Sequence, residues 1–182
     1  MTAADDKIRD CIDQRKSFIL DAGAGSGKTY SLVEALRYLF SSGIGSELAR
    51  NSQRIACITF TNVSKDQVVD RTGVSPLLHV STIHDFLWTV TKPHQNALKR
   101  ALIRHNKELD AESKRKRDAA ELAAALKTVN VNYSDRGADF LEGRLFHNDL
   151  LDVARLLFED NPLMAKIAAA QFPYIFVDEY QD

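Results

Sequence analysis

Eight consecutive residues have the types and spacing of a loop that binds phosphate: Ala22-Gly23-Ala24-Gly25-Ser26-Gly27-Lys28-Thr29. Glycine has no Cβ, so the backbone can curl and point its N–H groups inward at an anion. Lys28 can reach β- and γ-phosphates, and the Thr29 hydroxyl can ligate Mg²⁺. The usual pattern, G-x-x-x-x-G-K-[ST], has alanine at its first position here, and alanine fits wherever φ is negative. A glycine-rich turn that binds nothing is the alternative.

The segments on either side of the loop favour phosphate binding. Residues 16–21 are apolar at their centre and predict the first strand, while residues 29–42 repeat apolar side chains at three- and four-residue steps and predict a helix. A helix that starts at the loop adds unpaired N–H groups and the positive end of its dipole. Strand, glycine-rich turn and helix together are the context that a phosphate-binding loop needs.

A pair of acidic residues, Asp178 and Glu179, follows the apolar run 174–177, which predicts a strand. We expect Asp178 to hold Mg²⁺ through water, opposite Thr29. Glu179 is then placed to orient and deprotonate an attacking water. A solvated acidic pair at a strand end is the alternative, but the phosphate loop in the same chain favours the catalytic interpretation.

The remaining pattern alternates strands and helices. Residues 54–59 and 77–80 predict buried strands, each followed by a helix, and residues 3–16 predict a helix before the first strand, whereas 43–52 predict a loop. Such alternation predicts a parallel, helix-covered α/β sheet, which binds ligands beyond the carboxyl ends of its strands. From residue 92 to about 160 the pattern is helical, without strand candidates between 95 and 130. We therefore expect a core of residues 1–91 and 161–182 and a helical insertion of residues 92–160.

Composition narrows the class of protein. The 182 residues are 45% hydrophobic and 27% charged, and the net charge of −1 means that any nucleic-acid site must be local rather than a bulk property. Two unclustered cysteines predict neither a disulfide scaffold nor a metal site. The charged first fifteen residues do not resemble a signal peptide, and no apolar run approaches the roughly 18 residues of a membrane span. These features predict a cytoplasmic protein without membrane contact.

Four segments, taken in order, resemble motifs of superfamily 1 DNA helicases of the UvrD/Rep/PcrA type, RecB and AddA relatives included. Residues 22–29 are similar to motif I, Thr59-Phe60-Thr61-Asn62 to motif Ia, Ser81-Thr82-Ile83-His84-Asp85-Phe86 to motif Ib, and Val177-Asp178-Glu179-Tyr180-Gln181-Asp182 to motif II. Residues 147–151 also look like the segment upstream of motif II. The resemblance spans nearly the whole chain and covers its N-terminal, 1A/1B portion.

The resemblance implies a RecA-like P-loop NTPase sheet with a 1B-like helical insertion, and ATP hydrolysis coupled to movement along single-stranded DNA, typically 3′ to 5′. ATP and Mg²⁺ are the implied cofactors, with Gln181 joining Lys28, Asp178 and Glu179 in catalysis and Tyr30 beside the nucleotide. Phosphate contacts and base stacking fall to six residues: Phe60, Thr61, Asn62, Ser81, Thr82 and His84. A structural role for His84, and core packing for Phe86 and Trp88, are the alternatives.

A basic run, Lys114-Arg115-Lys116-Arg117, lies in the expected insertion. Such a run attracts the DNA backbone, although a solvated helix face gives the same composition. Adenine recognition, assigned in many family members to an N-terminal glutamine, falls on Gln14 by the resemblance, with Tyr30 as the alternative place for stacking.

The resemblance also implies missing parts. The helicases continue after motif II with a strand that senses γ-phosphate and a second RecA-like domain that supplies arginine fingers, so the sheet is expected to be truncated after its Walker B strand. Fingers can contribute roughly 10³ to 10⁵ in rate, so we expect little ATPase activity from these residues alone, without that domain in cis or a partner in trans. A non-catalytic module that holds nucleotide or single-stranded DNA is the alternative function. An unrelated P-loop kinase fits motifs Ia, Ib and II less well.

Overall fold

The computed structural model describes residues 3–21 and 27–178. The chain forms two compact units, one up to Thr82 together with the residues from Ala170 onward, and one from Ile83 to Ala169. The divisions expected from the sequence lie at residues 91 and 161 instead. The helix α5 (Ile83–Thr91) belongs to the second unit because it packs against α8 (His147–Asp160).

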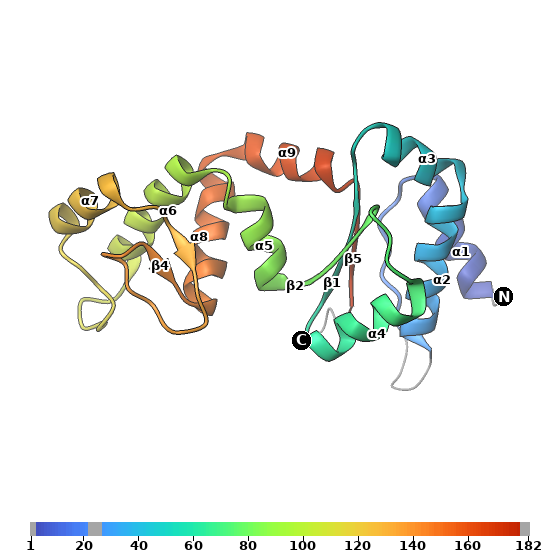
Figure 1. Ribbon diagram of the computed structural model, residues 1–182, viewed down its shortest axis with the longest axis horizontal. Coiled ribbons are helices and arrows are strands. Elements are labelled where there is room, and N and C mark those ends of the chain that lie inside the picture. Colours follow the sequence, from blue (N-terminus) through green and yellow to red (C-terminus); the bar gives the residue numbers. More distant parts are fainter. Residues whose placement is uncertain (1–2, 22–26, 179–182) are drawn as a thin grey trace. The chain divides into compact units, whose positions relative to one another are not determined.

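A three-stranded parallel sheet forms the centre of the first unit (Figure 1). The strands are β1 (Ile55–Thr59), β2 (Leu78–Thr82) and β5 (Tyr174–Val177), in the order β2-β1-β5. Ile55 of the central strand aligns with Leu78 on one side and Tyr174 on the other. All of β1 is buried, as its apolar sequence predicts for a central parallel strand. The predicted α/β fold with a parallel sheet is therefore confirmed.

The first unit has its core between the sheet and its helices α1 (Ala3–Asp13), α2 (Lys28–Ser41), α3 (Gly43–Arg50) and α4 (Asn62–Thr72). The prediction of a loop over residues 43–52 is wrong, because α3 occupies most of it. Glycine and serine suggested a loop, but Leu48 is buried in the core. Gly45 is needed there because a Cβ would lie 2.6 Å from the Leu39 carbonyl oxygen.

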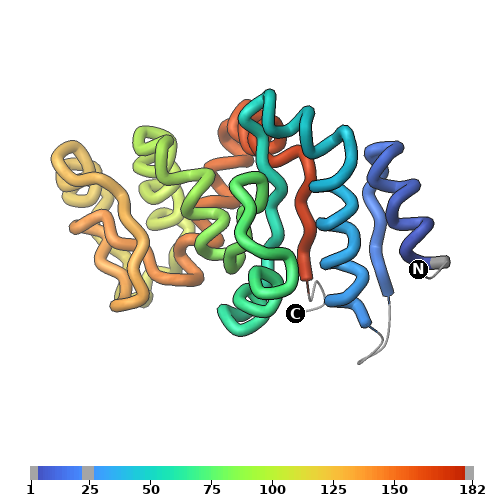
Figure 2. Tube along the Cα trace, turned by 45° about the vertical axis from the view of Figure 1, so that its right-hand side comes forward, coloured from blue at the N-terminus to red at the C-terminus, as the bar shows by residue number. Residues whose placement is uncertain are grey.

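The prediction of a strand over residues 16–21 is also wrong. These residues form no strand in the structure, although they follow an extended path that runs in the same direction as β5 (blue and red in Figure 2). Among the described residues, β5 pairs with β1 only. A strand exists only where a neighbour accepts its hydrogen bonds, and apolar composition alone cannot supply that neighbour.

The second unit is helical, with α5, α6 (Gln95–Glu108), α7 (Ala119–Thr128), α8 and most of α9 (Pro162–Gln171). Its core lies where α6, α7 and α8 meet, and includes Leu102, Leu122 and Leu157. The expected helical insertion also contains a short strand, β3 (Asn132–Tyr133), which pairs in parallel with β4 (Arg144–Leu145). Two-residue strands carry too little periodicity to be seen in a sequence.

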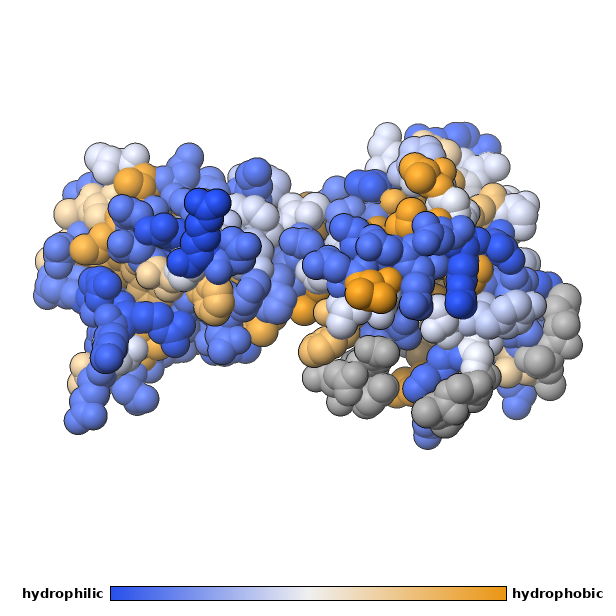
Figure 3. Space-filling view, turned by 60° about the horizontal axis from the view of Figure 1, so that its bottom comes forward, coloured by the Kyte–Doolittle hydropathy of each residue, from blue (hydrophilic) through white to orange (hydrophobic). Residues whose placement is uncertain are grey.

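The face of the molecule in Figure 3 is mostly hydrophilic, with scattered apolar patches. In the described part of the chain, no helix has the length and apolar character needed to cross a membrane. Exposed large apolar side chains of the first unit include Ile19, Phe60, Ile175 and Val177.

Candidate functional site

Helix α2 begins at Lys28, directly after Gly27. Gly27 has φ 87° and ψ 20°, a left-handed conformation that glycine adopts at no steric cost, and its carbonyl accepts a hydrogen bond from Ser31 N at 3.0 Å. Lys28 and Thr29 therefore occupy the first turn, where helical N–H groups are unpaired and the dipole favours anions. The predicted loop residues Ala22, Gly23, Ala24, Gly25 and Ser26 lie outside the described residues.

The acidic end of β5 is fixed by the sheet. Asp178 N donates to the Ile58 carbonyl at 2.9 Å, which continues the pairing of β5 with β1. The predicted catalytic residues Glu179 and Gln181 follow it and lie outside the described residues. Asp178 is thus held at the carboxyl end of its strand, the end at which parallel sheets bind ligands.

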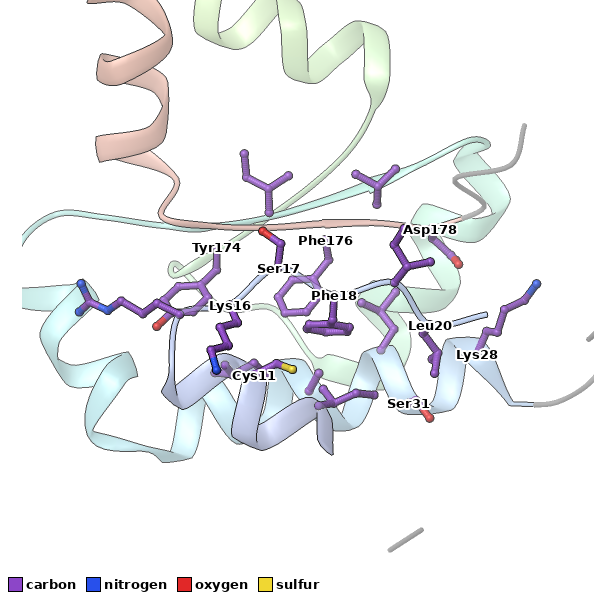
Figure 4. Close-up of a pocket in the computed structure, with 18 of the residues that line it drawn as sticks. Cys11, Lys16, Ser17, Phe18, Leu20, Lys28, Ser31, Tyr174, Phe176 and Asp178 are labelled. Carbon is purple, nitrogen blue, oxygen red and sulfur yellow. The ribbon is translucent and has the colours of Figure 1, made fainter. Parts of the chain in front are cut away.

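Lys28 and Asp178 line one pocket of about 730 Å³. Figure 4 shows both side chains at one end of this pocket, with Lys16 and Tyr174 toward the other. The fold therefore brings the lysine of the loop and the carboxylate after β5 to the same place, although about 150 residues separate them in the sequence.

Two oxygen donors are available to a Mg²⁺ ion. Asp178 offers a carboxylate at this end of the pocket, and Thr29 offers a hydroxyl in the first turn of α2, next to Lys28. Mg²⁺ prefers such oxygen ligands and completes its shell with water and phosphate oxygens. Within residues 3–21 and 27–178, no three histidine, cysteine or acidic side chains cluster to hold a metal ion by themselves.

Cys57, in the middle of β1, is a core residue rather than a nucleophile. Burial raises the pKa of its thiol to about 12, and the negative charge of Asp178 adds to the effect. The thiol is consequently neutral at physiological pH, and only the thiolate is nucleophilic.

Gln14 does not lie at the phosphate end of the first unit. Helices α1 and α2 run side by side: Ser31 Oγ donates to Asp5 at one end and Tyr38 Oη donates to Asp13 at the other. Gln14 follows Asp13, so it lies level with Tyr38, about 15 Å along α2 from Lys28. The buried residue beside the first turn of α2 is Asp5, whereas Tyr30 is 55% exposed on that turn.

Motif Ia forms the start of α4. Thr61 is the N-cap, and its Oγ1 accepts a hydrogen bond from Ser64 N at 3.1 Å. Asn62, the next residue, is exposed, and Phe60 has 59% of its surface exposed between β1 and the helix. The hydroxyl of Thr61 thus has a structural role, while Phe60 and the N-terminus of α4 face outward.

Motif Ib is divided between the two units. Ser81 and Thr82 end β2 in the first unit, but the Ser81 side chain is only 3% exposed. His84 belongs to the second unit and lies in a ring cluster with Tyr133 and His147, whose Nδ1 is 2.6 Å from Tyr133 Oη. Burial and the neighbouring His147 lower the pKa of His84, so it is neutral at pH 7. Nothing in the sequence predicted Tyr133 as the neighbour of His84.

Side chains of the basic run make hydrogen bonds and an ion pair within the second unit. Arg115 Nη1 lies 2.5 Å from the buried carboxylate of Asp149, and Lys116 donates to the Leu109 carbonyl. Arg117 donates to the Lys114 carbonyl at 2.8 Å. Asp149 also accepts from Phe146 N at 3.2 Å, at the start of α8. An acidic residue in a first helical turn was a usable sequence signal for that cap, but nothing in the sequence predicted the pairing with Arg115.

The chain is similar in sequence to known proteins. The sequence model of a family described as an AAA domain matches residues 7–182, nearly the whole chain. The Gabija protein GajB of Bacillus cereus (strain HuB5-5) is 41% identical over 91 residues, which are 50% of this chain and 13% of that protein. The matched region is thus a small part of GajB.

Proposed function

The chain belongs to the AAA_19 family of AAA domains, which are P-loop ATPase domains, and on that premise we propose that it is the ATP-binding part of a translocase that moves on single-stranded DNA. The observation that carries this proposal is the pocket whose one end holds both Lys28 and Asp178. A lysine at a helix N-terminus opposite a strand-end carboxylate is the arrangement needed to bind a nucleoside triphosphate with its magnesium ion.

Each residue of the site has a separate task in this proposal. Lys28 binds the β- and γ-phosphates, and the unpaired N–H groups of the first turn of α2 add to the attraction. Thr29 and Asp178 would hold Mg²⁺, and the ion would supply positive charge beside the phosphates. Glu179 orients and deprotonates the attacking water, and Gln181 acts beside it. Tyr30, exposed one residue after Thr29, is placed to stack on the base.

DNA binding is proposed for the edge formed by Phe60, Thr61 and Asn62. An exposed aromatic ring beside a helix N-terminus combines a surface for base stacking with N–H groups for a phosphate. Thr82 and His84 extend this set by the resemblance, and a neutral His84 contacts phosphate only through a hydrogen bond. The proposed 1A portion corresponds to the first unit and the proposed 1B portion to the second.

The proposal is tested by measuring Mg²⁺-ATP binding and steady-state hydrolysis with single-stranded DNA on the same sample. We expect saturable binding but turnover well below about 1 s⁻¹, because the motifs resembled here cover the family's 1A/1B portion, whereas the resemblance assigns the arginine fingers to a second RecA-like domain. The Glu179→Gln variant should keep the binding and lose any residual hydrolysis. Absence of nucleotide binding would contradict the proposal. Turnover above about 1 s⁻¹ would contradict the expected dependence on a second domain.

Replacing Phe60 with alanine should weaken binding of single-stranded oligothymidine about 5- to 100-fold, since stacking of one base contributes about 1–3 kcal/mol. Fluorescence anisotropy at fixed salt measures the affinity. Val74→Ala is the control, because Val74 is another solvent-facing apolar residue of the same unit, 94% exposed. Equal affinities for the two variants and the parent chain would remove Phe60 from the DNA site.

A further inference from the structure

A buried carboxylate lies between α1 and α2 in the first unit. Asp5, in the first turn of α1, is only 4% exposed. Acidic side chains are rarely buried this far unless hydrogen bonds or opposite charge stabilise them. The Oδ1 of Asp5 accepts a hydrogen bond of 3.1 Å from the Ser31 hydroxyl of α2. None of the tasks proposed above for the nucleotide site falls on Asp5.

The helices α1 and α2 lie side by side (Figure 1) and run in the same direction. Their direction follows from two hydrogen bonds, since Asp5 and Ser31 join the starts of the helices and Asp13 and Tyr38 join their ends. The dipole of each helix favours negative charge at its N-terminus, so a carboxylate between two adjacent N-termini is stabilised by both. This arrangement explains why an acidic side chain can be buried here.

Ser31 closes the first turn of α2. Its N–H donates to the Gly27 carbonyl at 3.0 Å, and Gly27 is the left-handed residue directly before the helix. Lys28 and Thr29 lie inside this turn, so a restraint on Ser31 also restrains the directions of their side chains. Figure 4 shows Lys28 and Ser31 on the same helix, with Lys28 nearer its start. The Ser31 hydroxyl therefore connects Asp5 to the turn that carries Lys28.

We propose that Asp5 is a positioning residue for the nucleotide site: through Ser31 it holds the first turn of α2 in the orientation that directs Lys28 at phosphate. Asp5 itself does not touch the nucleotide. The effect on nucleotide binding rests on the proposed function, whereas the restraint on the first turn does not.

The first turn of α2 needs such a restraint. Helix ends open locally more often than helix centres, and the N–H groups of a first turn have no partners within the helix. Gly27, directly before the turn, adds conformational freedom. A turn that is already held does not have to be ordered when nucleotide binds. Ordering of roughly one residue corresponds to about a fivefold change in affinity, so loss of the Asp5–Ser31 hydrogen bond should weaken nucleotide binding about fivefold or more.

The test compares the Mg²⁺-ATP affinities of Asp5→Ala, Ser31→Ala and the double variant. Each single variant should bind about fivefold or more weakly than the parent chain. The double variant should bind no more weakly than Asp5→Ala, because both substitutions remove the same hydrogen bond. Ser31→Ala is the sharper single variant, because alanine has a higher helix propensity than serine and a purely structural role would leave α2 as stable or more stable. Losses that multiply in the double variant overturn the proposal.

Two further variants separate positioning from charge and from helix packing. Asp5→Asn keeps an oxygen that can accept from Ser31, and Asp13→Ala removes the hydrogen bond to Tyr38 at the other end of the same helix pair. Both should bind Mg²⁺-ATP within about twofold of the parent chain. If Asp5→Asn binds as weakly as Asp5→Ala, the charge is responsible. If Asp13→Ala does so, packing of α1 as a whole is responsible. Either result overturns the proposal.

Hydrogen exchange of the Ser31 N–H, followed by NMR without nucleotide, tests the restraint itself. Exchange should be at least about fivefold faster in Asp5→Ala than in Asp13→Ala, because the first turn opens more often. If exchange changes in this way but the parent chain does not bind Mg²⁺-ATP, the proposed function fails, and with it the role of Asp5 in binding, while the restraint on the turn stands. Equal exchange rates overturn the positioning role even if the affinities differ.

Discussion

Replacing Lys28 with alanine should weaken Mg²⁺-ATP binding at least about 100-fold. The ammonium group of Lys28 lies at the same end of the pocket as Asp178. Its hydrogen bonds to the phosphate oxygens of ATP are bonds between two charged groups. Hydrogen bonds to charged groups contribute about 1.5–3 kcal/mol each, and a loss of about 3 kcal/mol corresponds to this change in affinity. Equilibrium binding of a fluorescent ATP analogue, at constant Mg²⁺, measures it.

The same pocket offers a matched control for this prediction. Lys16 lines the pocket toward its opposite end, so Lys16→Ala removes a lysine of the same charge from the same cavity. We expect its affinity for Mg²⁺-ATP to stay within about twofold of the parent chain, since long-range attraction between exposed charges is screened. If the two variants lose affinity equally, general attraction rather than the loop binds the nucleotide.

The second large effect is expected on stability. Asp149→Ala should lower the unfolding free energy of the second unit by about 2–4 kcal/mol, because one substitution removes a helix cap and the buried carboxylate of an ion pair. Asp149 is 1% exposed, accepts from Phe146 N, and lies 2.5 Å from Arg115 and 3.4 Å from His105. Arg115 is 44% exposed and can regain water, which limits the loss.

Trp88 reports on this unit selectively. It is the only tryptophan in the sequence, and it packs against the core of the second unit, with its ring beside Tyr133. Urea denaturation followed by its fluorescence should shift to a lower midpoint in Asp149→Ala. Asp152→Ala, on the same helix but not buried, should change the free energy by less than about 0.5 kcal/mol. Equal shifts in the two variants would mean that Asp149 contributes only through its helix position.

Patterns that depend on local chemistry were predictable from the sequence. The buried strand at residues 54–59, the apolar strand before Asp178 and the helix after Gly27 all appear close to their expected bounds. Pairing was not predictable, because it depends on residues far away in the chain. Residues 16–21 have the composition of a strand, yet their partner edge on β5 lies across a pocket.

The candidate site was likewise predictable where it depends on local patterns, and not where it depends on residues that are distant in the chain. Glycine spacing and the Lys28-Thr29 pair locate the start of α2, and an acidic residue after an apolar run locates the end of β5. The basic run suggested an exposed surface, but Arg115 is paired with a buried carboxylate that is 34 residues away. Gln14 has the right side chain for a base, but α1 places it level with Tyr38. The charge and type of a residue alone do not predict where its side chain lies in the fold.

The two cysteines give the protein a built-in spectroscopic handle. Cys57 is protonated and buried in β1, whereas Cys11 is only partly buried and lines the pocket beside residues 16–21. A maleimide dye therefore labels a single position in the native chain, without any engineered substitution. The emission of the dye reports the polarity of the pocket, so water leaving the pocket can be followed in real time.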